Sequence, residues 1–319
     1  MVVLGGMGSM LQKGGMPVGA LPEVYNITEP ERIIDAQKQF VAVGSDIIYA
    51  NTFGANRHKM AKSGYSVQEL IAAGIACARK ACAGTETKVA LDIGPIGQLL
   101  EPLGTLTFEE AYDIFKEEVL AGQDADLIVI ETMTDLYETK AALLAAKENS
   151  DLPIFATTIF DGKGKLLTGG TPKSVVALLE GLGVDALGIN CGLGPVQMKP
   201  IVEELLRYAS IPVVVNPNAG LPRSEGGKTV YDIDPPEFVE EMKGMLEMGV
   251  SAVGGCCGTT PEHIRLLAEM CKGRTRKPIE PKNDTLITSY ASVVEMGTDP
   301  VIIGERINPT GKSKFKQAL

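Results

Sequence analysis

The chain has 319 residues, of which 45% are hydrophobic and 22% charged, and its formal net charge is −10. This is the composition of an ordinary globular protein, and the acidic balance disfavours nucleic acid or an anionic membrane as a partner. No apolar run approaches the ~18 residues that span a bilayer, and the first residues form no basic leader. Six cysteines in such a chain indicate a reducing compartment and not a disulfide scaffold, so we expect a cytoplasmic protein.

Apolar, β-branched runs alternate with amphipathic segments along most of the chain. The runs cover residues 2–8, 46–54, 88–95, 126–133, 153–161, 185–192, 212–220 and 251–259. Helical spacing of apolar residues predicts helices over residues 29–44, 107–123, 171–183 and 260–273. Short apolar runs of this kind fit strands that are buried on both faces of a parallel sheet. Eight such units predict a closed (β/α)8 TIM barrel over residues 1–273, with a doubly wound open sheet as the alternative.

The pattern changes after residue 273. Residues 274–300 are charged and contain prolines, which is typical of a linker. Residues 301–319 resume a strand-and-loop pattern that is too short to bury a core of its own. We therefore expect this short C-terminal tail to be the truncated start of a second domain.

Polar residues collect at the carboxyl ends of the predicted strands, where the active sites of such barrels lie. They are Asn51, Thr52, Asp92, Glu131, Thr132, Thr157, Thr158, Cys191, Asn216, Asn218, Cys256 and Cys257. Three of the six cysteines are among them, on the sixth and eighth runs. Because side chains from alternate strands share a layer of the barrel, these thiols can converge.

Three converging thiolates are suited to a soft ion such as Zn²⁺. Three protein ligands leave a fourth position open, which is the arrangement of a catalytic zinc site, and the missing ligand could be a thiol substrate. A metal would lower the pKa of that thiol, and thiol alkylation is then the natural chemistry. The alternative is that Cys191, Cys256 and Cys257 are simply small buried hydrophobic residues.

The other candidate site residues indicate a function less specifically than the three cysteines do. Glu131 could bind a substrate ammonium group or pair with a loop, and Asp92 and Asn51 have the same ambiguity. We expect surface roles for His58 and His263, and packing roles for the remaining cysteines, Cys77, Cys82 and Cys271.

Three further classes of protein are disfavoured. The segment 304–313 departs from the P-loop spacing, and the glycines near the start fail the dinucleotide-binding pattern. A Schiff-base aldolase on this fold needs a lysine at a strand end, and no predicted end carries one.

Five segments together resemble the homocysteine S-methyltransferase family, across about residues 2–272 and in the right order. They are "MGSMLQ" (7–12), "ANTFGANR" (50–57), "GINCGLGP" (188–195), "PNAGLP" (217–222) and "GGCCGTTPEHI" (254–264). The tail "VIIGERINPTGKSKF" (301–315) resembles the opening of a pterin-binding, methyltetrahydrofolate domain. Such a domain follows the homocysteine domain in cobalamin-dependent methionine synthase, so the chain resembles the N-terminal homocysteine-binding module of that enzyme.

The resemblance implies a (β/α)8 barrel in which Cys191, Cys256 and Cys257 bind Zn²⁺ together with the sulfur of homocysteine. Glu131 would hold the amino group, and the backbone around Gly6 and Met7 would contact the amino-acid end of the substrate. Asn218 is a candidate fourth metal ligand when the substrate is absent. Asn51 and Thr52, which lie within one matching segment, complete the expected substrate-binding set.

The implied reaction is methyl transfer to the thiol of homocysteine, giving methionine, with the zinc-bound thiolate as nucleophile. The expected donor is methylcobalamin on a cobalamin-binding domain or a separate corrinoid protein, and a pterin-binding domain is a further expected partner. The alternatives are a free donor such as betaine or S-methylmethionine, a different thiol acceptor, or a zinc-free binding module. The family usually begins its first strand with Asp-Gly, and that aspartate is expected to help bind the ammonium group of the substrate. This chain has Leu4 or Gly5 at that position, so either homocysteine binds more weakly or another thiol is accepted.

Overall fold

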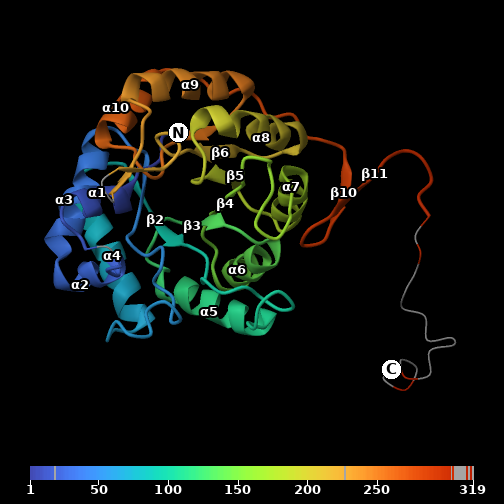
Figure 1. Cartoon of the computed structure of the whole chain (residues 1–319), viewed down its shortest axis with the longest axis horizontal. Helices are drawn as coiled ribbons and strands as arrows, with labels where there is room; N and C mark the ends of the chain where they lie inside the picture. Colours follow the sequence, from blue (N-terminus) through green and yellow to red (C-terminus); the bar gives the residue numbers. More distant parts are fainter. Residues whose placement is uncertain (18, 226–227, 303, 305–313, 315–316, 318–319) are drawn as a thin grey trace.

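The computed structural model describes residues 1–17, 19–225, 228–302, 304, 314 and 317. Parallel strands form a ring in the centre of the molecule, and the longer helices surround this ring (Figure 1). The predicted (β/α)8 barrel is therefore the observed fold, and the doubly wound open sheet is excluded.

Seven hydrogen-bonded strands make the main sheet, and each runs parallel to its neighbours. In order around the ring they are β1 (Ile47–Tyr49), β2 (Lys88–Ile93), β3 (Leu127–Met133), β4 (Ile154–Thr158), β5 (Ala186–Asn190), β6 (Val213–Asn216) and β9 (Ala252–Val253). Almost every residue of these strands is buried, because the barrel interior covers one face and the helices cover the other.

Two single bridges close the ring. Val2 pairs with Val253 of β9, and Val3 pairs with Ile47 of β1, both in parallel orientation. The first predicted strand, residues 2–8, is thus reduced to two bridging residues, and from Met7 the chain is already helical. Glycines at positions 5 and 6 follow these bridges and interrupt the extended run.

The helices begin and end where local sequence signals place them. They are α1 (Met7–Lys13), α2 (Tyr25–Thr28), α3 (Pro30–Ala42), α4 (Val67–Ala81), α5 (Phe108–Ala121), α6 (Leu136–Asn149), α7 (Pro172–Gly181), α8 (Pro195–Tyr208), α9 (Pro235–Met248) and α10 (Pro261–Cys271), with a 3₁₀ turn, η1 (Pro22–Val24). The predicted capping box of Thr107 and Glu110 is present at the start of α5. Thr171 caps α7 and Thr260 caps α10, each directly before a proline.

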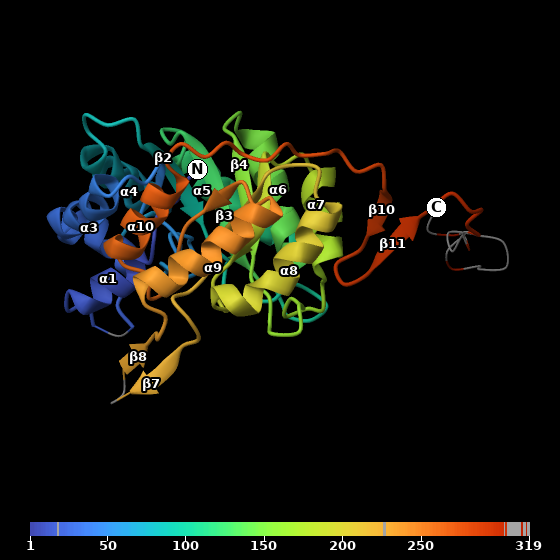
Figure 2. The same cartoon turned by 90° about the horizontal axis from the view of Figure 1, so that it is seen from above.

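Two hairpins lie outside the ring. The first, β7 (Arg223–Glu225) with β8 (Lys228–Val230), follows the carboxyl end of β6 and projects from one end of the barrel (Figure 2). The second, β10 (Thr285–Thr288) with β11 (Val293–Met296), lies within the segment 274–300 that we predicted as a linker.

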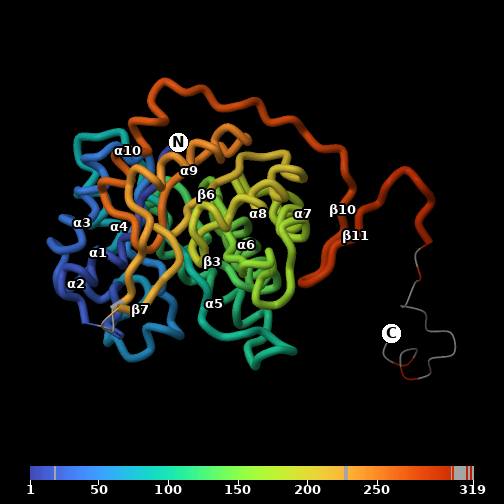
Figure 3. Tube along the Cα trace, turned by 45° about the horizontal axis from the view of Figure 1, so that its top comes forward, coloured from blue at the N-terminus to red at the C-terminus, as the bar shows by residue number. Residues whose placement is uncertain are grey.

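The segment between α10 and the second hairpin crosses the molecule as one extended trace (Figure 3). The side chain of Lys277 donates to the carbonyl of Glu247, and the amide of Lys282 donates to the hydroxyl of Ser210. These contacts place the segment at the amino-terminal end of the barrel, because α8 and α9 end there. The predicted start of a second domain, residues 301–319, falls almost wholly outside the described residues.

One continuous apolar core joins the barrel interior to the layer between strands and helices. Its largest fully buried side chains include Phe40, Phe115 and Phe238, one on each of three surrounding helices. Among the described residues, no helix is long and apolar enough to cross a membrane.

A candidate metal centre at the carboxyl end of the barrel

Three thiols meet at the carboxyl ends of β5 and β9. The sulfur atoms of Cys191, Cys256 and Cys257 lie within 4.8 Å of one another, and the Sγ atoms of Cys191 and Cys257 are 3.9 Å apart. Positions that are 65 residues or more apart in the chain are thereby brought to one place by the barrel. The convergence predicted from the strand pattern is observed.

The backbone aims Cys191 toward the other two cysteines. Cys191 follows β5 with a φ of 58°, in the left-handed region that non-glycine residues rarely occupy. Its amide donates to the carbonyl of Asn216, the last residue of β6. Strain of this kind costs about 1–3 kcal/mol and is found mainly at functional sites.

The pair Cys256–Cys257 is fixed by main-chain hydrogen bonds on both sides. The amide of Cys256 donates to the carbonyl of Pro217, and the carbonyl of Cys257 accepts from the amide of Ala219. Gly6 packs so closely that a Cβ atom there would lie 2.6 Å from the carbonyl oxygen of Cys256. The start of the chain therefore forms one wall of the site.

The three thiols influence one another strongly. Hydrogen bonds from Cys191 and Cys256 lower the pKa of Cys257 to about 3. The same sulfur contacts, together with burial, raise the pKa of Cys256 well above its usual value. The cluster is therefore built to hold negative charge on sulfur close to Cys257.

The dimensions of the cluster fit a small thiophilic cation. With Zn–S bonds of ~2.3 Å, tetrahedral geometry places two sulfurs about 3.8 Å apart, which agrees with the separation of Cys191 and Cys257. The predicted fourth ligand, Asn218, is buried, and its Oδ1 has no hydrogen-bond partner in the part of the chain that the structure describes. The backbone amide of Asn218 donates to the backbone carbonyl of Leu193, which lies two residues after Cys191. A buried oxygen without a donor is suited to a metal or a substrate donor.

Glu131 stands beside the thiols on a bulge of β3. The register with β4 shifts between Ile130 and Met133, so an extra residue is inserted in β3 at Glu131 and Thr132. Burial and the neighbouring Cys257 raise the pKa of Glu131 to about 8. The position of Glu131 near the thiols agrees with its expected role beside a substrate.

Asn190 supports this bulge, and the sequence reasoning missed it. Its Oδ1 accepts from the amide of Thr132 and from the hydroxyl of Thr157, both at 2.8 Å. Its Nδ2 donates to Thr132 Oγ1 at 2.8 Å and to Glu131 Oε2 at 3.3 Å. Asn190 directly precedes Cys191, and an asparagine at the end of an otherwise apolar run was the available signal.

Polar groups of the other predicted substrate-binding residues make hydrogen bonds that hold the fold. The Nδ2 of Asn51 donates to the carbonyl of Pro22 and to Asn26, and Thr52 Oγ1 donates to the carbonyl of Asp92. The amide of Gly6 donates to Thr259 Oγ1, and the amide of Met7 to the carbonyl of Gly5. Gly6 adjoins Cys256, whereas Asn51 is held by η1 and α2.

Two of the remaining predictions are confirmed and one is wrong. Cys77 and Cys82 are buried in packing positions, Cys271 is half-buried against the core, and His58 is exposed. His263 is buried and does not have the surface role that we expected, because its Nδ1 completes the capping box of α10 with Thr260. Its Nε2 lies 3.3 Å from the carbonyl of Ile233, and burial lowers its pKa.

Comparison with known proteins gives the same family as the motifs. The homocysteine S-methyltransferase family model matches residues 1–271. The methionine synthases of Mycobacterium tuberculosis and Mycobacterium leprae are each 31% identical to this chain over its full length. The chain spans only 29% of the length of these two relatives.

Solved structures support the fold. The metallated form of the homocysteine methyltransferase MmuM from Escherichia coli superposes with a TM-score of 0.72 at 24% identity, covering 85% of this chain and 96% of that one. The match of the family model to most of the chain confirms the predicted family and class of enzyme. The chain belongs to the homocysteine S-methyltransferase family.

Proposed function

We propose that this chain is the zinc-dependent module that accepts a methyl group on the thiol of homocysteine and yields methionine. One observation carries the proposal: the three sulfurs of Cys191, Cys256 and Cys257 lie together at the carboxyl end of the barrel, at separations suited to zinc. Glu131, a carboxylate next to Cys257, is suited to the ammonium group of an amino acid. The arrangement can thus bind two groups of homocysteine at different places, the thiol at the cysteines and the ammonium group at Glu131.

Held by these three sulfurs, zinc would lower the pKa of a thiol in its open fourth position and so keep a nucleophilic thiolate at neutral pH. The chain's own residues fix the geometry around that thiol. Asn190 holds Glu131 and Thr132, whose φ of 60° lies in the left-handed region. The bonds of Cys256 and Cys257 to the segment 217–219 fix the thiol pair. Because Gly6 has no side chain, the backbone of Cys256 can pack directly against it.

In the transfer, a sulfur–carbon bond forms as the bond between the methyl carbon and its donor breaks. The electron pair of that bond leaves with the donor. We propose methylcobalamin as donor, held by another domain or by a separate corrinoid protein. The support is that the whole chain matches methionine synthases but spans only 29% of their length, so these relatives have further domains. A pterin-binding domain is a further proposed partner. A free donor such as betaine or S-methylmethionine is the second possibility within the same chemistry.

The zinc site can be tested directly on the purified chain. We expect about one zinc per chain by elemental analysis, lost in Cys257→Ala and retained in Cys82→Ala, a matched change of a buried cysteine outside the cluster. Removing one ligand lowers affinity by more than the ~10–100-fold typical of outer-shell partners. Zinc-edge X-ray absorption is expected to count three sulfurs without homocysteine and four with it. Zinc that stays bound in Cys257→Ala would contradict the proposal.

The donor is tested separately, by assaying homocysteine methylation with methylcobalamin, betaine or S-methylmethionine added alone. Methionine formed only with methylcobalamin supports the proposed donor. Turnover with betaine alone would exclude it while leaving the thiol site intact. A chain that binds no zinc and methylates no thiol with any of the three would instead be a binding module.

A further inference from the structure

Two carboxylates face the interior of the barrel from adjacent strands. Asp92 of β2 pairs with Val129 of β3, and Glu131 lies two residues further along β3. Residues two apart in a strand point to the same face, so Asp92 and Glu131 are diagonal neighbours on one face of the sheet. Figure 1 shows β2 and β3 side by side at the ring.

That face is the inner one. Asn216 of β6 donates to the hydroxyl of Tyr49 of β1 at 3.4 Å, and this contact crosses the ring. Tyr49 pairs with Ala90, so Ala90 and Asp92 point inward with it. Asp92, like Glu131, therefore projects toward the space next to the thiols.

Asp92 is buried and forms no salt bridge in the described part of the chain, although the charge of Lys59 acts to lower its pKa against the larger effect of burial. The side chain is 6% exposed, and its Oδ1 has no hydrogen-bond partner in the described part of the chain. Its backbone is held on both sides by Thr52, whose hydroxyl donates to the Asp92 carbonyl and accepts from the Asp92 amide. Burial, and then the charge of Glu131, raise the pKa of Asp92 well above its usual value. A fixed, desolvated carboxylate of this kind calls for a cation from outside.

We infer that Asp92 is a second carboxylate for the ammonium group of the amino-acid substrate, and that it acts with Glu131 to select thiols that carry this group. The inference rests on the proposed function, since the thiol end of the substrate is assigned to the cysteines. An ammonium group has three hydrogens to donate. Glu131 already accepts from Asn190 with one oxygen, whereas Asp92 Oδ1 is free within the described chain.

The test compares two ligands on the zinc-loaded protein. L-Homocysteine and 4-mercaptobutanoate share the thiol, the chain length and the carboxylate, and only homocysteine has the ammonium group. Dissociation constants are measured by calorimetry for the wild type, for Asp92→Asn, and for Glu138→Gln as a control. Glu138 is similarly buried but lies on α6, outside the ring.

We expect Asp92→Asn to weaken homocysteine binding at least tenfold and to change 4-mercaptobutanoate binding less than twofold. Glu138→Gln is expected to leave the preference between the two ligands unchanged. Equal losses for both ligands in Asp92→Asn, or no loss, would overturn the inference. If homocysteine and 4-mercaptobutanoate both fail to bind the wild type, the proposed function fails and the inference falls with it.

Folding of each variant is checked by its melting temperature. We expect no decrease in Asp92→Asn, because the change removes a buried charge without removing an internal partner. If Asp92→Asn does not fold, the dissociation constants of the two ligands are compared in Asp92→Ser instead.

Discussion

The two ends of the barrel use polar residues in opposite ways. At the amino-terminal end, aspartates directly before β1, β3 and β5 each accept a hydrogen bond from the neighbouring strand. Asp46 accepts from the amide of Val2, Asp126 from Val89 and Asp185 from Ile154, at 2.7–2.8 Å. At the carboxyl end, Asp92, Asn216 and Asn218 each have a buried oxygen without a partner among the described residues.

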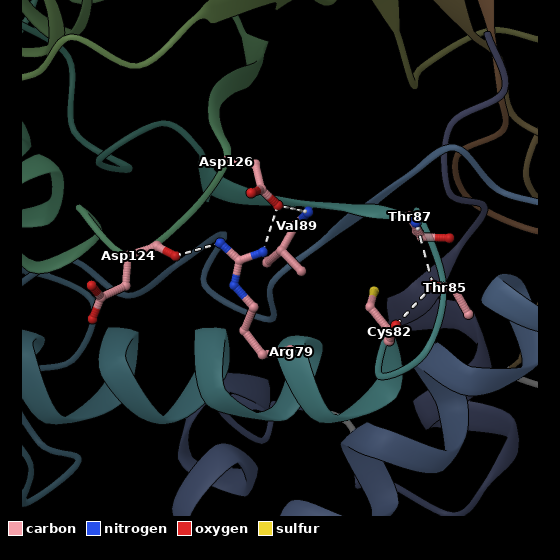
Figure 4. Close-up of polar contacts among 7 residues, drawn as sticks. All are labelled: Arg79, Cys82, Thr85, Thr87, Val89, Asp124 and Asp126. Carbon is pink, nitrogen blue, oxygen red and sulfur yellow. Dashed lines mark hydrogen bonds and ion pairs between the residues drawn. The ribbon is translucent and has the colours of Figure 1, made fainter.

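Figure 4 shows one unit of the amino-terminal end. Arg79 of α4 donates to Asp126 and to the carbonyl of Asp124, both at 2.6 Å, and Asp126 also accepts from Val89. These hydrogen bonds tie α4 to the starts of β2 and β3. The comparison teaches that the aspartates of the amino-terminal end are used to hold the fold, whereas the carboxyl end keeps buried carboxylate and amide oxygens and strained turns for a ligand.

The largest effect is expected from Asn190→Ala at the carboxyl end. The change leaves the amide of Thr132 and the hydroxyl of Thr157 without an acceptor in a buried site, at about 1–3 kcal/mol for each group. We expect the free energy of unfolding to fall by about 3 kcal/mol, measured by urea denaturation. A loss below about 1 kcal/mol would mean that water replaces Asn190 and that the bulge does not depend on it.

Gly6→Ala tests how tightly the start of the chain closes the thiol site. The new methyl group would lie 2.6 Å from a backbone oxygen of Cys256, so something must shift, at about 1–3 kcal/mol. We expect a tenfold or larger loss of zinc affinity in a chelator competition. Gly8→Ala is the matched control, since its methyl group meets nothing within 4 Å. Equal zinc affinities in the two variants would contradict the described packing.

Asp126→Asn tests the hydrogen bonds at the amino-terminal end of the barrel. The hydrogen bonds from Arg79 and Val89 outweigh partial burial and hold the pKa of Asp126 below its usual value. Because the pair is partly exposed, we expect a loss of about 1–2 kcal/mol in unfolding free energy at neutral pH, and unchanged zinc content.

The pH dependence of that loss has a definite sign. A lowered folded-state pKa contributes stability above the unfolded value of ~3.9, and this contribution disappears as pH falls through the folded-state pKa. Urea titrations from pH 7 to pH 3 should therefore show wild type and Asp126→Asn converging. A difference that is constant with pH would show that the charge of Asp126 is not responsible.

The smallest effect is expected at the outer surface, which belongs to neither end. Lys173 of α7 pairs with Glu295 of β11, and Glu295 is exposed. Such pairs contribute about 0–1 kcal/mol, so Glu295→Gln should change the melting temperature by about a degree or less. A large decrease would show that the second hairpin is an integral part of the barrel.

The barrel and its thiols were predictable because both follow from repeated local patterns. Eight apolar runs of similar spacing define the ring, and a ring brings strand ends together whatever the intervening sequence. The cysteines at two of these ends were therefore enough to predict that the thiols converge. The start of α5 was predictable in the same way, because the capping residue Thr107 lies next to the helix in the sequence.

What could not be predicted depends on tertiary contacts. The role of Asn190 requires knowing that β3 bulges toward it, and the burial of His263 requires knowing that α10 turns it toward Ile233. The second hairpin, residues 285–296, pairs strands of only four residues in a polar, proline-containing context. Its pattern is too short to distinguish from a linker.

The closure of the ring has a consequence for how the protein opens. Val2 and Val3 form the bridges between β9 and β1, backbone hydrogen bonds of Met1 and Leu4 lie beside them, and β9 itself pairs with β6 through two residues. This sector is the thinnest part of the sheet, and Cys256 and Cys257 follow β9 after two glycines. An ion shared between them and Cys191 would link the end of β9 to the end of β5 and so reinforce the two-residue pairing of β9 with β6. Loading the metal should then slow amide exchange at Gly254, whose amide donates to the carbonyl of Val215 in β6, more than in strands remote from the site.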